Sequence, residues 1–266
     1  MHIHTNSSDG ILTPTEVVEW SKKLGLQGIA ITDHDTVDGI EEGLKTASKY
    51  DDFIVIPGIE FSTLYKEKEI HILGYFFDYK NRDLLNMTEK IKAHRNNRAR
   101  LMIELLKNLG IDIKIEEVIQ DHEESSIGRP HIARILVSKG YAHSIQEAFD
   151  KYLNKGKPAY VGRYKLSLEE SVKIIDSASG IPVLAHPGLI DKTIDIHEIC
   201  NLGIKGMEVY HTQHSLEDTR IFLSMAKEMK LIITGGSDYH DMFINGTPAI
   251  GSVTIPFETI RYYYQK

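Results

Sequence analysis

Nine histidine, aspartate and glutamate residues along the chain are candidates for binding divalent metal ions. His2 and His4 are two residues apart, so in an extended segment both imidazoles point to the same side. Asp238 and His240 repeat this spacing near the other end of the chain. Imidazole and carboxylate ligands without a thiolate fit Mn, Fe or Zn. The candidate ligands are His2, His4, Asp9, His34, Glu60, His71, His186, Asp238 and His240.

The number of candidate ligands indicates a site with more than one ion. Nine residues are too many for a single ion and enough for two or three. Such a site suits the hydrolysis of phosphate esters, because a hydroxide that bridges two ions forms at neutral pH and attacks phosphorus. Glu60 could serve this chemistry by bridging two ions with its two oxygens. No Ser-His-Asp elbow, glycine-rich nucleotide loop or Walker motif offers a competing chemistry.

The elements that must position these residues alternate between short apolar strands and helices. Strands are predicted at residues 1–5, 28–32, 53–59, 70–77, 181–185, 206–210 and 231–234. Helices are predicted near residues 13–25, 37–50, 168–179, 194–202 and 216–229, and a short strand and a last helix within 249–266. The candidate ligands follow these strands or lie on them. In parallel α/β folds the carboxyl ends of the strands meet at one edge, so we expect one shared site there.

The alternation stops between residues 79 and 160, where the sequence predicts only helices. Apolar residues at three- and four-residue steps predict a long helix over 81–109, and two shorter helices follow near 130–139 and 144–153. We therefore expect an α/β barrel domain of residues 1–78 and 161–266, with 79–160 as a helical insertion that acts as a lid or substrate subdomain.

The totals exclude several classes of protein. The chain has 266 residues, 41% of them hydrophobic, and can bury a full core. Its net charge of −7 argues against a dedicated nucleic-acid coat, and no DNA partner is predicted. No apolar run approaches the ~18 residues that span a bilayer, and no signal peptide is visible. The single cysteine, Cys200, excludes internal disulfides, so a cytoplasmic location is expected, while the oligomeric state stays open.

The first predicted strand has only Met1 before His2. Few ladder hydrogen bonds are then expected to anchor the first pair of ligands. Further residues upstream of Met1 would be expected to raise metal occupancy.

The candidate ligands lie in short motifs that span nearly the whole chain. These motifs are His2-x-His4-Thr5, Ser8-Asp9-Gly10, Thr32-Asp33-His34-Asp35, Pro57-Gly58-x-Glu60, His71-x-Leu73-Gly74, Ala185-His186-Pro187 and Gly236-Ser237-Asp238-x-His240. In this order they resemble the motifs of the PHP (polymerase and histidinol phosphatase) superfamily. The resemblance implies a distorted (β/α)7 barrel with a trinuclear metal site at its carboxyl rim.

The resemblance also implies how the ligands are shared among the ions. One ion would be held by His2, His4, Glu60 and Asp238; a second by Asp9, His34 and His240; a third by Glu60, His71 and His186. Some members carry His at the position of Asp9. Aspartate there favours a harder metal, so Mn is expected over Fe or Zn.

Motifs in the insertion narrow the resemblance to one subgroup. They are Gly128-Arg129-Pro130-His131-Ile132-Ala133-Arg134, Leu136-Val137, Gly140, Ala148-Phe149, Tyr152-Leu153 and Gly156-x-Pro158-Ala159-Tyr160-Val161, with Glu208-Val209-Tyr210-His211 and His214-Ser215 further on. They are similar to the subgroup that dephosphorylates nucleoside 3',5'-bisphosphates and trims short oligoribonucleotides from 5' to 3'. A phosphorylated nucleotide or a short RNA end is therefore the expected substrate.

Several other polar residues are candidates for substrate binding or proton transfer. Arg129 and His131 begin an insertion helix, where free N–H groups and a cation favour an anion, although His131 could equally be structural. His211 and His214 follow a strand and could protonate the leaving group, with packing as the open alternative. The remaining candidates for phosphate binding are Arg163 and Lys165.

Residues 90–100 carry five Lys or Arg and no acid. For them a solvated helix face is favoured over a groove for RNA.

Two alternatives to the predicted activity remain at this point. One is a phosphatase of the same fold acting on another phosphate monoester, such as histidinol phosphate, or on a cyclic nucleotide. The other is a scaffold that binds metal without catalysis. The complete set of ligands argues against the scaffold, because degenerate members lose ligands.

Overall fold

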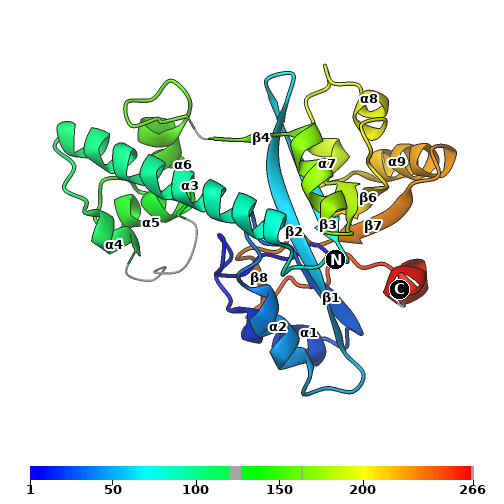
Figure 1. Ribbon diagram of the computed structural model, residues 1–266. Helices are drawn as coiled ribbons and strands as arrows, with labels where there is room; N and C mark the ends of the chain where they lie inside the picture. The colour runs from blue at the N-terminus through cyan, green and yellow to red at the C-terminus, as the bar shows by residue number, and fades with distance from the viewer. Residues whose placement is uncertain (120–126, 163, 265–266) are drawn as a thin grey trace.

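Among the residues that the computed structural model describes, 1–119, 127–162 and 164–264, seven strands form one mixed sheet (Figure 1). Six of them follow the order β1-β2-β3-β5-β6-β7, and β4 pairs with β2. The antiparallel neighbours are β2 with β3 and β3 with β5, and the other pairs are parallel. The bounds are β1 (Gly28–Ile31), β2 (Ile54–Tyr65), β3 (Lys68–Tyr75), β4 (Leu166–Ser167), β5 (Ile181–Leu184), β6 (Gly206–His211) and β7 (Ile232–Gly236).

The N-terminal segment lies between the two edges of this sheet and closes it. The Met1 ammonium donates a hydrogen bond to the Gly235 carbonyl at 2.9 Å, and the Thr32 N–H donates to the Ile3 carbonyl at 2.9 Å. The prediction of a first strand over residues 1–5 is wrong in detail, because Ile3 forms only an isolated parallel bridge, with Tyr239. The predicted distorted barrel is confirmed: the sheet curls, and this segment joins its first and last strands.

The long hairpin of β2 and β3 changes the expected place of Glu60. The sequence predicted that a strand ends just before Glu60, but β2 continues to Tyr65. Its parallel pairing with β1 stops at Pro57, and from Gly58 onward it pairs antiparallel with β3. Glu60 therefore lies within a strand, where its neighbours on both sides hold it firmly. An isolated bridge to His34 continues the parallel ladder beyond β1.

The helices of the barrel begin at well-formed caps. Reciprocal side-chain and backbone hydrogen bonds join Thr13 to Glu16 and Ser167 to Glu170, and each such box satisfies N–H groups that a helix start leaves unpaired. The helices cover the sheet and bury residues such as Ile59, Phe61 and Leu184. They are α1 (Pro14–Lys23), α2 (Ile40–Ala47), α7 (Leu168–Ser177), α8 (Ile196–Cys200) and α9 (Leu216–Glu228).

The insertion stands to one side of the sheet and has a hydrophobic core of its own (Figure 1). Its helices are α3 (Arg82–Asn108), α4 (Ile115–Ile119), α5 (Arg129–Ser138) and α6 (Ile145–Ala148), the last continuing as a π-helical turn, Phe149–Leu153. The first half of α3 buries Leu84 and Ile91 in the barrel core. Its second half buries Met102 and Leu106 against the other insertion helices. One helix thus belongs to both cores.

The C-terminal part departs from its prediction. A hairpin of β8 (Phe243–Ile244) and β9 (Thr247–Pro248) precedes a 3-10 turn, Phe257–Thr259, and α10 (Arg261–Tyr264). Within the described residues after 248, no strand forms, so the predicted strand there is wrong and only the short last helix agrees. No helix in the described part of the chain is long and apolar enough to cross a membrane.

Candidate metal centre

The structure brings all nine candidate ligands to one edge of the barrel, around the buried carboxylate of Glu60. Glu60 Oε2 lies 3.3 Å from His2 Nε2, 3.2 Å from His4 Nε2 and 3.0 Å from His34 Nδ1. Its other oxygen lies 2.8 Å from His71 Nδ1 and 3.0 Å from His186 Nε2. Each Glu60 oxygen therefore faces a different set of imidazoles.

A first group consists of His2, His4, Glu60 and Asp238. Asp238 Oδ1 lies 3.3 Å from His2 Nε2 and 3.1 Å from His4 Nε2. These ligand atoms are buried, and none has a well-formed hydrogen bond within the described structure. Buried polar atoms without partners are costly and rare, and a divalent cation in their midst would satisfy all four. The donor set therefore fits a metal ion.

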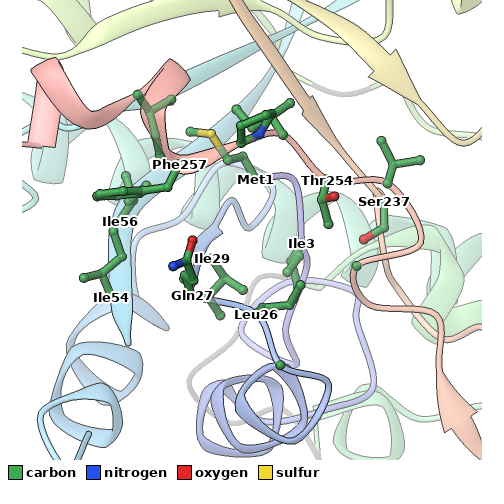
Figure 2. Close-up of a pocket in the computed structure, with 17 residues that line it drawn as sticks. Met1, Ile3, Leu26, Gln27, Ile29, Ile54, Ile56, Ser237, Thr254 and Phe257 are labelled. Atoms are coloured by element: carbon green, nitrogen blue, oxygen red, sulfur yellow. The ribbon is translucent and has the colours of Figure 1, made fainter. Parts of the chain in front are cut away.

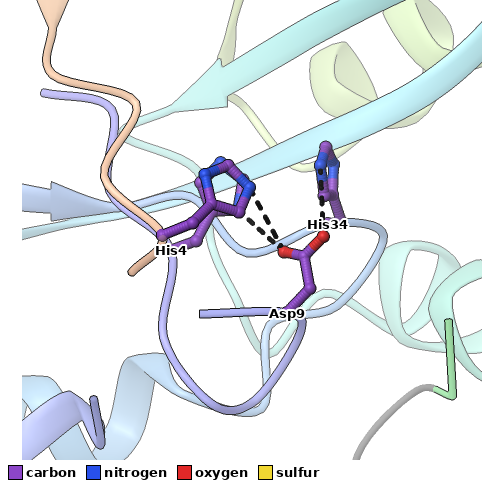
Figure 3. A group of neighbouring side chains, drawn as sticks. His4, Asp9 and His34 are labelled. Carbon is purple, nitrogen blue, oxygen red and sulfur yellow. Dashed lines mark ion pairs between the residues drawn. The ribbon is translucent and has the colours of Figure 1, made fainter. Parts of the chain in front are cut away.

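A second group consists of His4, Asp9, His34 and His240, and Figure 3 shows the first three. The Asp9 carboxylate lies 3.8 Å from His4 Nδ1, 4.0 Å from His34 Nε2 and 3.4 Å from His240 Nε2. His240 Nδ1 donates a hydrogen bond to the Asp238 carbonyl at 3.0 Å, which leaves Nε2 facing Asp9 as an acceptor or metal ligand.

The third group consists of His34, Glu60 and His71. The resemblance implied His186 as a member in place of His34. His186 lies beside Glu60 Oε1, the oxygen that His71 also contacts, but it is not a member of this compact group. The backbone of His186 has a positive φ of 25°. Asp238 likewise has a positive φ, of 50°. Non-glycine residues in this region cost roughly 1–3 kcal/mol each and concentrate at functional sites.

The charges of the cluster favour a cation among the ligands. Burial works against protonated His4 and His71, but the carboxylates of Glu60 and Asp238 outweigh it and raise the pKa of His4 to about 10. Beside Glu60 the pKa of His71 rises to about 9. Burial lowers the pKa of His34 to about 3, so this imidazole stays neutral. When no metal is present, protons on the histidines balance the negative charge of the carboxylates. Metal ions and protons should therefore compete for the imidazole nitrogens.

Two glycines allow the backbone to approach the first ligands closely. A Cβ on Gly236 would lie 2.3 Å from the His2 nitrogen, and one on Gly10 would lie 2.6 Å from the His4 carbonyl oxygen. Both contacts are with backbone atoms, which cannot move aside cheaply. Glycine in these motifs therefore lets the N-terminal segment lie flat against its neighbours.

Glu208, on β6, belongs to a motif that the sequence analysis quoted, but it was given no role there. Its side chain is fully buried and accepts hydrogen bonds from His2 Nδ1 at 3.0 Å and from the His186 N–H at 2.9 Å. Burial opposes its ionisation, but His2 more than compensates and lowers the pKa of Glu208. Because Nδ1 of His2 donates to it, Nε2 is free to bind an ion. The available signal was a glutamate inside an otherwise apolar strand.

The loop that carries His34 is fastened from both sides. Asp33 accepts hydrogen bonds from the Thr5 N–H at 2.7 Å and from the Ser8 hydroxyl at 2.6 Å, which ties it to the N-terminal segment. Asp35 accepts from the Ser62 N–H at 2.9 Å and pairs with the guanidinium of Arg95, on α3.

The basic residues between 90 and 100, on α3, are therefore not all exposed, although the sequence predicted a solvated helix face. Arg95 and Arg98 are both only 8% exposed. Arg95 joins the insertion to the loop beside the candidate ligands through Asp35, and Arg98 donates to the Val161 carbonyl at 2.7 Å.

A cavity of about 190 Å3 separates this cluster from the insertion. Arg129 and His131, at the start of α5, share its lining with Asp9, His34 and His71. His131 Nδ1 accepts a hydrogen bond from the Gly128 N–H at 2.8 Å and so caps the helix. This contact supports the structural role that the sequence left open for His131. Arg134, one turn further along α5, donates to the Asp9 carbonyl at 3.3 Å.

The other predicted substrate residues are less closely associated with the cluster. Lys165 lies further out and donates to Glu69 at 2.6 Å. Arg163 lies outside the described residues.

The two remaining histidine candidates have different places. His211 Nε2 lies 3.4 Å from Asp238 Oδ2, while its Nδ1 accepts the Gln213 N–H at 3.2 Å. His211 is therefore in contact with the cluster. His214 donates from Nδ1 to the Val209 carbonyl at 2.9 Å and accepts the Gly188 N–H at Nε2, at 3.1 Å. Proton transfer by His214 would require one of these bonds to break, so its geometry favours the packing alternative.

A comparison with known families matches residues 1–175 to the PHP domain. The chain belongs to the PHP family. The match covers about two thirds of the chain and includes six of the nine candidate ligands, while His186, Asp238 and His240 lie in the remaining third.

Curated relatives and a solved structure extend the similarity over nearly the whole chain. The chain is 32% identical to the 5'-3' exoribonuclease Rnm of Escherichia coli, over 90% of this chain and 84% of that protein. It is 34% identical to the 3',5'-nucleoside bisphosphate phosphatase of Chromobacterium violaceum, over 90% of this chain and 86% of that protein. A crystal structure of a Bifidobacterium adolescentis protein matches with a TM-score of 0.88 and 29% identity, covering 99% and 94% of the two chains. The predicted family and the predicted class of phosphate-ester hydrolase are confirmed.

Proposed function

We propose that this PHP protein hydrolyses nucleoside 3',5'-bisphosphates, short 5'-phosphorylated RNAs, or both. One observation carries the proposal: the buried ligand atoms of His2, His4, Glu60 and Asp238 converge without hydrogen-bond partners, beside a cavity that a helix start lines on its other side. The similarity to an exoribonuclease and a bisphosphate phosphatase supports this substrate class.

The three groups of ligands support two or three divalent ions. Mn is the proposed metal, since oxygen and nitrogen ligands without a thiolate suit it, and Fe or Zn would also fit such a set. When bound, the ions would supply an activated water and neutralise charge on the phosphate oxygens. Glu60 would join neighbouring ions, and Glu208 would hold His2 in the tautomer that binds metal.

The protein's own groups would select the substrate. Arg129 offers a planar guanidinium to a phosphate, and the first N–H groups of α5 add a favourable dipole. His131 would contribute from the same helix start. His211, in contact with Asp238, is the proposed proton donor to the leaving group. Lys165 would act further along the substrate, and Arg163 stays a candidate for phosphate binding.

We also propose that residues 79–160 act as a substrate subdomain over the metal edge. Its separate core lets it hold its own shape, and Arg95 and Arg134 join it to the loops of Asp35 and Asp9. Binding the substrate between this subdomain and the barrel would exclude water from the cavity.

The test is phosphate release from 3'-phosphoadenosine 5'-phosphate and nucleotide release from 5'-phosphorylated RNA, with Mn added. Activity on either substrate is expected, and Arg129→Ala should raise KM while the exposed Arg220→Ala does not. A metal-loaded protein that hydrolyses histidinol phosphate or a cyclic nucleotide but neither of these would overturn the substrate class. Metal analysis showing far fewer than one ion per chain would favour a non-catalytic scaffold.

A further inference from the structure

A groove of about 1000 Å3 begins where the cavity beside the ligands ends. The two spaces share Glu69, Arg98 and Arg129 in their linings, so they are adjoining parts of one depression. The groove then leads away from the ligands, between the β2–β3 hairpin and the segment after α6. Its further lining includes Lys68, Lys155, Tyr160, Tyr164 and Lys165.

The charge of this groove is opposite to that of the whole chain. Five cationic residues line it and two carboxylates, Glu67 and Glu69, accompany them, whereas the chain carries a net charge of −7. Glu69 is already bound to Lys165 at 2.6 Å. A positive groove in an acidic protein concentrates a polyanion at one place. Phosphates along a strand are the repeating charge that such a groove matches.

Two tyrosines add a surface that is suited to bases. The Tyr164 ring stacks on His94 of α3, with ring centroids 4.7 Å apart, and its hydroxyl accepts from Lys90 at 3.0 Å. These contacts fix Tyr164 as part of the wall. Tyr160 is half-buried, and no aromatic ring packs on it in the described part of the chain. Aromatic rings beside cations form the usual binding surface for single strands, since every base can stack.

We propose that this groove binds the nucleotides that follow the 5' end of a single-stranded RNA substrate. The proposal deepens the proposed function and rests on it: the terminal phosphate lies in the cavity by the ligands, and the rest of the strand follows the groove. A nucleoside bisphosphate fills only the cavity. An RNA strand also gains contacts with Lys155 and Tyr160, so the enzyme should favour oligonucleotides over mononucleotides.

The experiment compares kcat/KM for 5'-phosphorylated RNAs of increasing length with that for 3'-phosphoadenosine 5'-phosphate. We expect kcat/KM to rise over the first few nucleotides and then level off. Tyr160→Ala and Lys155→Gln should each lower the ratio of RNA to mononucleotide kcat/KM about fivefold or more, while Tyr160→Phe keeps it. Lys155→Gln should also reduce the slope of log kcat/KM against log salt by about 0.7. Lys157→Gln, an exposed lysine of the same loop outside the groove, is the matched control and should leave the ratio unchanged.

A second measurement does not depend on activity. The affinity of chelator-treated protein for an RNA labelled at its 3' end is followed by fluorescence anisotropy, and Tyr160→Ala should weaken it several-fold. Rates that are independent of RNA length, with equal effects of each variant on both substrates and unchanged anisotropy, would overturn the groove but leave the proposed function standing. Length-dependent, Tyr160-dependent binding without hydrolysis of either substrate would support the groove and overturn the proposed function.

Discussion

The two ends of the barrel use the same strands for opposite purposes. At the carboxyl edge, Glu60 and the histidines bury polar atoms that have no hydrogen-bond partners within the described structure. At the other end, the beginnings of β1 and β2 line a cavity of about 290 Å3 whose side chains are mostly, but not only, apolar (Figure 2). Ile54, Ile56 and Phe257 are among its lining residues. A single strand, β2, therefore contributes a hydrophobic wall at its start and the central carboxylate six residues after Ile54.

This difference separates stability from function within one domain. Burial of apolar side chains stabilises the folded state by roughly 1.5–3 kcal/mol each, whereas buried polar atoms without partners destabilise it. The metal edge is therefore expected to be stable only with ions or protons among its carboxylates. Substitutions at the metal edge should therefore change metal binding and activity, whereas substitutions at the other end should change the free energy of unfolding.

The largest effect is expected from Glu60→Gln at the metal edge. Glu60→Gln removes the charge that faces two sets of imidazoles, so it should lower kcat/KM by more than the about 10–100-fold that loss of a partner behind a metal-binding side chain costs. His71→Gln should cost less, because His71 contacts only one Glu60 oxygen and Glu60 contacts two sets of imidazoles. Turnover at saturating metal measures both. Equal losses would contradict a bridging role for Glu60.

A substitution at the opposite end should affect folding and leave metal binding intact. Ile56 is 2% exposed and packs with Leu73 and Tyr75, so Ile56→Ala should lower the free energy of unfolding by about 2–5 kcal/mol. Chemical denaturation of the metal-free protein measures this loss. Metal affinity of the folded variant should match that of the parent, and a large loss of affinity would show that the two ends are coupled.

A smaller effect is expected from Glu208→Gln, which keeps the shape of the side chain. The amide oxygen can still accept from His2, but the NH2 group cannot accept from the His186 N–H, and the charge that supports the His2 imidazole is lost. Loss of such a partner behind a metal-binding histidine costs about 10–100-fold in metal affinity or activity. Metal titration of chelated protein is the measurement. Unchanged affinity would mean that Glu208 has only a packing role.

The smallest expected effect is the response of the metal-free protein to pH. The pKa of His71 is raised to about 9 and that of His4 to about 10, so both stay protonated longer when folded than when unfolded. This stabilisation is fully present below pH 6.5 and is lost as the pH rises through 9 and 10. The melting temperature of chelator-treated protein should therefore fall between pH 7 and pH 10. With metal bound the fall should be smaller, and a rise for the metal-free protein would contradict this account.

The successes and failures of the sequence analysis have a common physical cause. Residue types, spacing and hydrophobic periodicity report on local structure, so most of the strands and the helical insertion were predictable. The continuation of β2 past Glu60 was not, because it depends on pairing with β3. The solvated face expected for α3 was wrong at Arg95 and Arg98 for the same reason: the partner surface, including Asp35, is distant in sequence.

By itself the sequence determined the family, the nine candidate ligands and the order in which strands deliver them. Those depend on short motifs, in which neighbours along the chain define the geometry. Only the tertiary structure decided which ligands share a group, that Glu208 stands behind His2, and that α3 is anchored beside His34. These contacts join residues that are far apart in the chain, and their geometry depends on how the sheet curls and how the insertion packs against it.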